Sequence, residues 1–391
     1  MIHRRAISGL ARMFCCHMHQ NELDPVAVPS MADLMTLTKA LGAGGRVIRS
    51  VFFGFKAGVD VWISRASFAA DHKLRDALLL ALRTGCDSRD IAALKMCGKD
   101  DLSLLYDVVP RSRRAEHRDW NNCRIGAAML NDKAICNERA RGAGIKVPTQ
   151  VSLDGSIVVR STNRSNLLEF SHPAVTPNTL WMLKDRQGLQ GDAVWAGKAC
   201  TPLVARELGD DVLARMLEHL GRSGRLVAEE FLRPERYFSD AGDTALPTVR
   251  VVTSKLGTTT AVVGLVLFRG ASGSLTSHRK HGGKLYVIND SGACSEGLDK
   301  FGKRWEACGF EFSSPQLDDI RVMCLRAHEL FSCVGSIGWD VGISNQGMFL
   351  LEGNPNWGMN VPQLLPGRSM LQDFTSSRFR DTWTISRIRR R

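Results

Sequence analysis

The most informative stretch of the chain is Gly338-Trp339-Asp340-Val341-Gly342-Ile343-Ser344-Asn345-Gln346-Gly347-Met348-Phe349-Leu350-Leu351-Glu352-Gly353-Asn354-Pro355-Asn356. Two apolar runs flank a polar Ser-Asn-Gln-Gly turn, a pattern typical of a β-hairpin. Such a hairpin puts Asp340 near the open end of its first strand, and Glu352 and Asn354 at the matching end of the second. The sequence therefore predicts that three oxygen-bearing side chains meet at one place.

Hard oxygen donors grouped in this way suit Mg²⁺. An ordinary hairpin with a solvated Asp340 and Glu352 stays open at this point, because charges are common at strand ends. The chain has no GxxxxGK[ST] phosphate loop, no GxGxxG turn and no GxSxG elbow. Several common nucleotide and hydrolase sites are thereby excluded.

Composition places the chain among globular proteins. It has 391 residues, 44% of them hydrophobic, and a formal net charge of +12. This is enough apolar material for a sizeable core and argues against a disordered protein. The positive excess lies at the N-terminal tip, at residues 111–124 and at residues 378–391, without a recognisable motif for reading nucleic acid. An anionic substrate explains the charge as well, and we expect no nucleic-acid partner.

Cysteine usage and hydropathy indicate the compartment. The 11 cysteines are scattered without a CxxC pair, so neither a disulfide framework nor a zinc finger is indicated. The longest apolar stretches, such as 256–268, are shorter than the roughly 18–20 residues of a membrane span. The N-terminus lacks the apolar core of a secretion signal. These features predict a cytoplasmic protein without a transmembrane segment.

Apolar periodicity changes along the chain. It predicts a flexible basic N-terminus over 1–30 and a helical N-terminal region over 31–121. Two further helices are expected at 202–220, broken at Gly209, and at 315–332, with Ser314 as the N-cap. Short β-branched runs predict strands at 157–160, 180–184, 226–232, 248–254, 259–268, 284–288, 337–343 and 348–351. Segregated helices and strands favour an α+β fold with mostly antiparallel sheets.

Several segments together resemble the ATP-grasp superfamily. The D-x(11)-E-x-N pattern from Asp340 to Asn354 resembles its metal-binding end, and Asp132-Lys133, opening a helix followed by Gly144 to Pro148, resembles its entry segment. Lys184 followed by Gln187 to Gly191 resembles its strand lysine and glycine-rich phosphate lid, and 227–232 the strand that ends at the adenine hinge. Residues 248–253 and 282–292 look most like the sugar-transfer-associated ATP-grasp family, which is found beside polysaccharide genes.

The resemblance covers roughly residues 122–364 and implies two α+β subdomains that grip ATP. The ATP-grasp domain is then expected over 122–375, followed by a basic C-terminal tail over 376–391. The implied cofactors are ATP and Mg²⁺, with two ions expected and Mn²⁺ as a substitute.

The site residues follow from the same resemblance. The implied metal ligands are Asp340, Glu352 and Asn354. The candidate catalytic residues are Arg250 and Arg269, as cations for a developing phosphoryl or carboxylate charge. The implied ATP-binding residues are Lys133, Lys184, Gly188, Gly191, Glu229, Glu230, Phe231, Leu232 and Glu235.

Structural roles stay open for several of these side chains. Lys184 could discourage aggregation at a strand edge, Lys133 could be a surface lysine of a first helical turn, and Glu235 could belong to a solvated turn. Arg250 and Arg269 could each form a salt bridge with a neighbouring carboxylate.

The implied activity is that of an ATP-dependent ligase. It would join a small-molecule carboxylate to an amine, a thiol or a sugar-linked acceptor through an acyl phosphate, in making cell-surface polysaccharides or sugar conjugates. The chain departs from the family at Asp185, where many members have Pro, and it lacks the usual Asn before Gly282-Gly283. These departures support a second hypothesis, a non-catalytic ATP-grasp-like protein that binds an anionic polymer. The oligomeric state is not indicated.

Overall fold

A computed structural model describes residues 122–358, with gaps at 154–157, 162–166, 188–193, 200–211, 257–258, 279–280, 290 and 300–302. The predicted basic N-terminus, helical N-terminal region and basic C-terminal tail lie outside the described residues. So do the predicted lid glycines Gly188 and Gly191.

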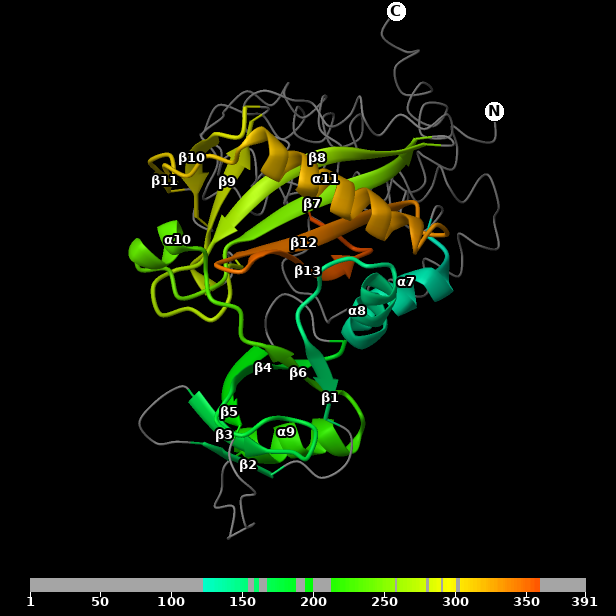
Figure 1. The fold of residues 1–391 in the computed structure, drawn as a ribbon, viewed down its shortest axis with the longest axis vertical. Coiled ribbons are helices and arrows are strands. Elements are labelled where there is room, and N and C mark those ends of the chain that lie inside the picture. Colours follow the sequence, from blue (N-terminus) through cyan, green and yellow to red (C-terminus); the bar gives the residue numbers. More distant parts are fainter. Residues whose placement is uncertain are drawn as a thin grey trace, which may run out of the picture. The chain divides into compact units, whose positions relative to one another are not determined.

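The larger sheet has seven strands, and every neighbouring pair is antiparallel. Its spatial order is β11-β10-β9-β8-β7-β12-β13, so the C-terminal hairpin pairs with the middle of the chain through β7 (Figure 1). The strands are β7 (Thr248–Leu256), β8 (Thr259–Arg269), β9 (Lys284–Ile288), β10 (Cys294–Leu298), β11 (Arg304–Trp305), β12 (Ser336–Ser344) and β13 (Gly347–Asn354).

The smaller sheet has six strands in the order β1-β6-β4-β5-β3-β2. Its pairs are antiparallel except for β3 with β5, which run parallel. The strands are β1 (Gln150–Ser152), β2 (Val158–Ser161), β3 (Leu167–Ser171), β4 (Leu180–Asp185), β5 (Val194–Ala199) and β6 (Leu226–Glu230). The predicted α+β fold with mostly antiparallel sheets is confirmed.

Helices cover each sheet. Helices α7 (Arg124–Asn131), α8 (Lys133–Gly142) and α11 (Ser314–Glu329) pack on the larger sheet and share one apolar core with it. Helix α9 (Val212–Arg222) packs on the smaller sheet, and the short α10 (Arg236–Asp240) follows β6 (Figure 1). Among the described residues, none of the helices has the length and apolar character needed to cross a bilayer.

The predicted hairpin is present as β12 and β13. All nine residues of β12 are buried, and its turn closes at Gly347, whose φ of 103° favours glycine. The Ser344 hydroxyl donates to the Gly347 carbonyl over 2.7 Å, which holds the turn. Asp340 pairs directly with Glu352 across the hairpin. The sequence predicted that these ends meet, but the direct pairing of Asp340 with Glu352 depends on a register shift between Asp340 and Val341 that it did not predict.

The start of α11 differs from the prediction by one residue. The N-cap is Ser313 and not Ser314, because the Ser313 hydroxyl accepts from the Gln316 backbone N–H while the Gln316 side chain accepts from the Ser313 N–H over 2.8 Å. This reciprocal capping box satisfies two backbone donors at once. For the helix predicted at 202–220, the described part is α9, which ends at Arg222.

Strands β1, β3, β5, β10 and β11 were not predicted from the sequence. They have two to six residues each and include polar or small side chains, so no apolar run marks them. Pairing with a neighbouring strand, and not intrinsic propensity, makes them strands.

A buried polar chain joins α11, β7 and β12 behind the hairpin. The Trp339 indole N–H donates to Thr253 Oγ1 over 2.9 Å, and Thr253 Oγ1 lies 2.7 Å from His328 Nδ1. His328 Nε2 lies 2.8 Å from the Val334 carbonyl, which can only accept, so Nε2 carries the proton. Burial lowers the pKa of His328 to about 4, so the imidazole is neutral near pH 7.

We therefore expect His328 to make stability depend on pH. Its folded pKa of about 4 lies below the ordinary value of 6.5, so the unfolded chain binds more protons between these values and stability falls as the pH is lowered through this range. From pH 7 to pH 5 the His328 contribution to the free energy of unfolding should fall by about 2 kcal/mol. Urea unfolding at both pH values should show a smaller loss in His328→Gln. An unchanged loss in that variant would contradict this, and exposed His219→Gln is the matched control.

Candidate active site

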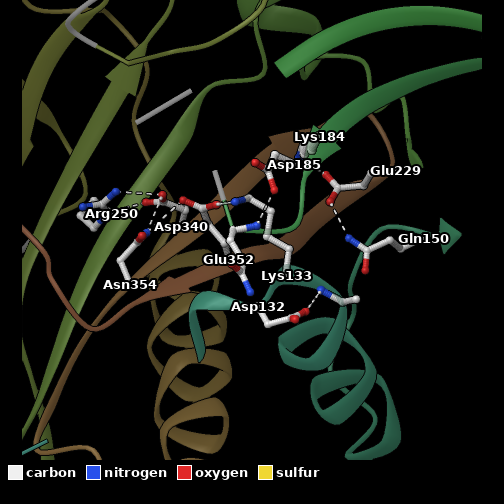
Figure 2. Close-up of polar contacts among 12 residues, drawn as sticks. Asp132, Lys133, Gln150, Lys184, Asp185, Glu229, Arg250, Asp340, Glu352 and Asn354 are labelled. Carbon is white, nitrogen blue, oxygen red and sulfur yellow. Dashed lines mark hydrogen bonds and ion pairs between the residues drawn. The ribbon is translucent and has the colours of Figure 1, made fainter. Parts of the chain in front are cut away.

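The hairpin brings two carboxylates and an amide together. Asp340 on β12 faces Glu352 on β13, and Asn354 follows on β13. The Asn354 amide nitrogen lies 3.0 Å from Glu352 Oε1 and 3.4 Å from Asp340 Oδ2 (Figure 2). The three side chains predicted to meet at one place therefore do meet.

Arg250 neutralises the first carboxylate. It lies on β7 directly opposite Asp340, and its guanidinium binds both carboxylate oxygens, with Nη2 and Oδ2 2.8 Å apart (Figure 2). Burial raises the pKa of Asp340 to about 6, although Arg250 acts in the opposite direction. The salt bridge that the sequence left open as an alternative for Arg250 is thus present, and it is made with a predicted metal ligand.

Lys133 neutralises the second carboxylate. Its Nζ lies 3.7 Å from Glu352 Oε2. Burial favours the protonated form of Glu352, but Lys133, the Asn354 hydrogen bond and the more distant Lys184 and Arg250 outweigh it and lower the pKa of Glu352 to about 2. Lys133 is 7% exposed, which excludes the surface lysine that the sequence left open.

Asp132 fixes the helix that carries Lys133. Its Oδ1 accepts from the backbone N–H groups of Ala134 and Ile135, each over 3.1 Å, and so caps α8. The Arg186 guanidinium also binds both oxygens of Asp132, and the Lys133 backbone N–H donates to the Arg186 carbonyl over 3.0 Å. The start of α8 is therefore tied to the end of β4.

Lys184 on β4 forms an ion pair with Glu229 on β6. Gln150 on β1 donates to the other oxygen of Glu229 over 3.5 Å (Figure 2). An ammonium group has three donors, so Lys184 can bind Glu229 and a further anion together. Because Lys184 and Lys133 both act on the charge of Glu352, the two lysines predicted to bind phosphates share one electrostatic environment.

Asp185, which departs from the family pattern, has its charge balanced. One carboxylate oxygen pairs with Arg225 and the other accepts from the Gln187 backbone N–H over 3.0 Å. An acid next to the expected phosphate site would otherwise repel a triphosphate. This pairing removes that objection.

The other residues predicted to bind the nucleotide are found at and beyond the end of β6. Glu230 accepts from the Thr149 N–H over 3.3 Å, while Glu235 accepts from the Tyr237 N–H over 2.8 Å and caps α10. Leu232 is buried and Phe231 half-buried beyond the end of β6. The nucleotide contacts assigned to these residues stay predictions.

Arg269 does not join the cluster around Asp340. Its guanidinium binds both oxygens of Asp243, over 2.8 and 2.9 Å, and lies over the Phe238 ring. On β8 it lies beyond Val266, the residue opposite Arg250, by about 10 Å of strand. The structural ion pair that the sequence left open is present here, and the catalytic role of Arg269 stays a prediction.

The donor set fits a divalent cation. Two carboxylates and an amide offer only oxygen ligands, which Mg²⁺ and Mn²⁺ accept. Because an amide can turn about its last bond, Asn354 can present its oxygen in place of the nitrogen that now faces both acids. The described residues contain no cluster of three or more His, Cys, Asp or Glu side chains that could hold a metal, so this mixed set is the candidate.

Four contact residues were missed by the sequence analysis: Gln150, Arg186, Arg225 and Asp243. Each pairs with a group distant in sequence, so no local pattern marks them. Asp132 did carry a signal, because Asp is a favoured N-cap residue and it lies in the segment predicted to open this helix.

Comparison with known protein families shows to which family the chain belongs. A model of the sugar-transfer associated ATP-grasp family matches residues 112–377. The chain belongs to this family. Its α+β architecture is the ATP-grasp fold, and the resemblance seen in the sequence motifs is confirmed. No curated protein matches the chain.

Solved structures with low identity are also similar. D-alanine–D-alanine ligase from Bacillus anthracis, complexed with ATP, is 13% identical with a TM-score of 0.36, and 68% of each chain is covered. An L-amino acid ligase from Bacillus licheniformis is 10% identical with a TM-score of 0.36, covering 66% of this chain and 51% of that one. Biotin carboxylase from Campylobacter jejuni is 10% identical with a TM-score of 0.39, covering 63% and 45%. The chain spans about half the length of the latter two.

Packing behind the hairpin should not tolerate a larger side chain at Gly353, which lies between Glu352 and Asn354 on β13. A Cβ there would lie 2.6 Å from Leu130 on α7 and 2.6 Å from the Trp339 ring. We expect Gly353→Ala to lower the free energy of unfolding by about 1–3 kcal/mol. Urea unfolding measures this, with Gly142→Ala as the matched control because nothing lies within 4 Å of its Cβ. Equal effects of the two substitutions would contradict the close packing.

Proposed function

We propose that the protein is an ATP-dependent ligase that joins a carboxylate to an amine, or to a thiol, through an acyl phosphate. The observation that carries this proposal is the convergence of Asp340, Glu352 and Asn354 with Lys133 and Arg250 in a member of an ATP-grasp family. Oxygen ligands for a cation and fixed positive charges for phosphates are what Mg²⁺-ATP needs.

Asp340, Glu352 and Asn354 would hold Mg²⁺, or Mn²⁺ in its place, with two ions expected. Bound there, the metal would supply charge neutralisation to the phosphate oxygens. In holding it, Asn354 would present its amide oxygen, while Arg250 and Lys133 would keep the two carboxylates in place.

Lys133 and Lys184 would bind the phosphate groups of ATP. They come from different elements, α8 and β4, so they can reach different phosphates as separate point charges. The lid glycines Gly188 and Gly191 would bring backbone N–H groups to the same phosphates. Glu229 and the segment Glu230 to Leu232 would bind the adenine, and Glu235 the ribose.

The reaction would occur in two steps. A carboxylate oxygen of the substrate attacks the γ-phosphorus, the bond to the bridging oxygen breaks, and ADP leaves with its electron pair. The amine then attacks the carbonyl carbon, phosphate leaves, and the amine proton passes to solvent. Arg250, held in place by Asp340, would stabilise charge on the transferred phosphoryl group, and Arg269 is a further candidate for this role.

The acceptor is proposed to be an amino sugar or a sugar-linked precursor of a cell-surface polysaccharide. The family's association with sugar transfer supports this class. A cytoplasmic location and small-molecule substrates belong to the same proposal, and both rest on the sequence.

The second candidate function is a non-catalytic protein that binds an anionic polymer. One of its two grounds was the charge of Asp185 beside the expected phosphate site. Because the Asp185 carboxylate is paired with Arg225 and the Gln187 N–H, its charge no longer favours this candidate. The missing Asn before Gly282-Gly283 remains in its favour.

Calorimetric titration of Mg²⁺-ATP into the protein tests the nucleotide site. Glu352→Gln removes a charge with little change in volume, and we expect it to weaken binding tenfold or more, about 1.4 kcal/mol. Exposed Glu306→Gln is the matched control and should bind as the wild type does. Thermal melting of each variant would confirm that it is folded. Absence of heat with the wild type would contradict the ligase proposal and favour the polymer-binding one.

A further inference from the structure

Two exposed cysteines lie side by side where α7 begins. Cys123 precedes α7, and its backbone N–H donates over 2.9 Å to the carbonyl of Cys333, in the turn between α11 and β12. The two side chains lie close enough for each thiol to shift the pKa of the other. A Cβ at Gly126 would lie 2.4 Å from Cys333 Sγ, so this glycine leaves room for the thiol against the first turn of α7.

The backbone around the two thiols is held in place by Asn122. Its Oδ1 accepts from the N–H groups of Gly335 and Ser336, over 2.8 and 3.3 Å, and its Nδ2 donates to the Pro355 carbonyl over 3.4 Å. The backbone hydrogen bond between Cys123 and Cys333 keeps the two residues close together, as a disulfide requires.

We propose that Cys123 and Cys333 form a thiol–disulfide exchange site that reacts with small-molecule disulfides such as oxidised glutathione and closes to an intramolecular disulfide. The proposal stands on two accessible thiols on segments that already share a backbone hydrogen bond. It is independent of the proposed ligase activity.

The two cysteines have different roles in this reaction. Backbone N–H groups of Gly126 and Ile125, at the start of α7, and the Cys333 thiol lower the pKa of Cys123. Partial desolvation and the nearby Cys123 thiol raise the pKa of Cys333. Since the thiolate is the nucleophile, Cys123 attacks first and Cys333 completes the exchange.

The exchange balances as follows. The Cys123 thiolate attacks one sulfur of oxidised glutathione, the S–S bond breaks, and one glutathione leaves as a thiolate that takes up a proton. Cys333 then loses its proton to solvent and attacks Cys123 Sγ, and the second glutathione leaves. Two protein thiols are oxidised to one disulfide, and one glutathione disulfide is reduced to two thiols.

The disulfide would tie the start of α7 to the turn before β12. Helix α8, which carries Lys133, follows α7, and β12 carries Asp340. The closed loop runs from residue 123 to residue 333, and such a long loop gives a large restriction of the unfolded chain. Because the two backbones are already bonded, the folded chain needs little movement to form it.

Cys294 and Cys308 provide an internal comparison. These two thiols also shift each other's pKa, but the residues are only 8% and 7% exposed, and both belong to the apolar core. A dissolved disulfide therefore does not reach them in the folded protein. Mutual influence of the thiols is common to the two pairs, and accessibility distinguishes them.

The test is treatment of the full-length protein with excess oxidised glutathione near neutral pH, followed by digestion without reduction and mass spectrometry. We expect a cross-linked peptide that joins Cys123 to Cys333 and a melting temperature about 5 °C higher. Absence of that peptide, or a mixed disulfide that persists on Cys123, would overturn the proposal.

Serine variants separate the roles of the two thiols. Cys333→Ser should retain one glutathione on Cys123 without a rise in melting temperature, and Cys123→Ser should slow modification of Cys333 at least tenfold. Cys308→Ser is the control and should form the cross-link at the wild-type rate. Equal reaction of Cys333 with and without Cys123 would overturn the assigned order. Circular dichroism would verify that each variant is folded.

Discussion

Two carboxylates that face each other across a hairpin must have cations beside them, and much of the larger sheet is arranged to meet this constraint. Asp340 and Glu352 are paired in register, and each would repel the other if left alone. Arg250 reaches Asp340 because β7 is the other neighbour of β12. Lys133 reaches Glu352 because α8 packs on β13. Strand order and helix packing thus each bring a cation to this pair of acids.

Further ion pairs hold these cations in place and involve strands of the smaller sheet. Asp132 caps α8 and binds Arg186 at the end of β4, while Lys184 on β4 binds Glu229 on β6. The backbone of Lys133 and Arg186 thus links the two ion pairs around α8, and Lys184 lies near enough to lower the pKa of Glu352. A triphosphate with its metal would enter a site whose positive and negative groups are already positioned, which lowers the cost of ordering them on binding.

Local pattern predicted the hairpin and the meeting of its three oxygen-bearing side chains, because strand alternation and turn residues act over a few positions. The family resemblance marked Lys133 and Lys184. Neither could identify Arg186 or Arg225 as partners, since those contacts depend on which strands and helices become neighbours. The short strands β3 and β5 were missed for the same reason. The sequence correctly left open a salt bridge for Arg250, and only the strand order shows that its partner is Asp340.

A crystal structure of the protein with Mn²⁺ and a non-hydrolysable ATP analogue, measured for anomalous scattering, would test the proposed metal and phosphate site. We predict a manganese peak bound by oxygens of Asp340, Glu352 and Asn354, with phosphate oxygens in contact with Lys133 and Lys184. The Asn354 amide should be turned relative to its present hydrogen bonds to both acids. Manganese bound elsewhere, with Lys133 still on Glu352 and Arg250 still on Asp340 as in the present structure, would contradict the proposed metal and phosphate site.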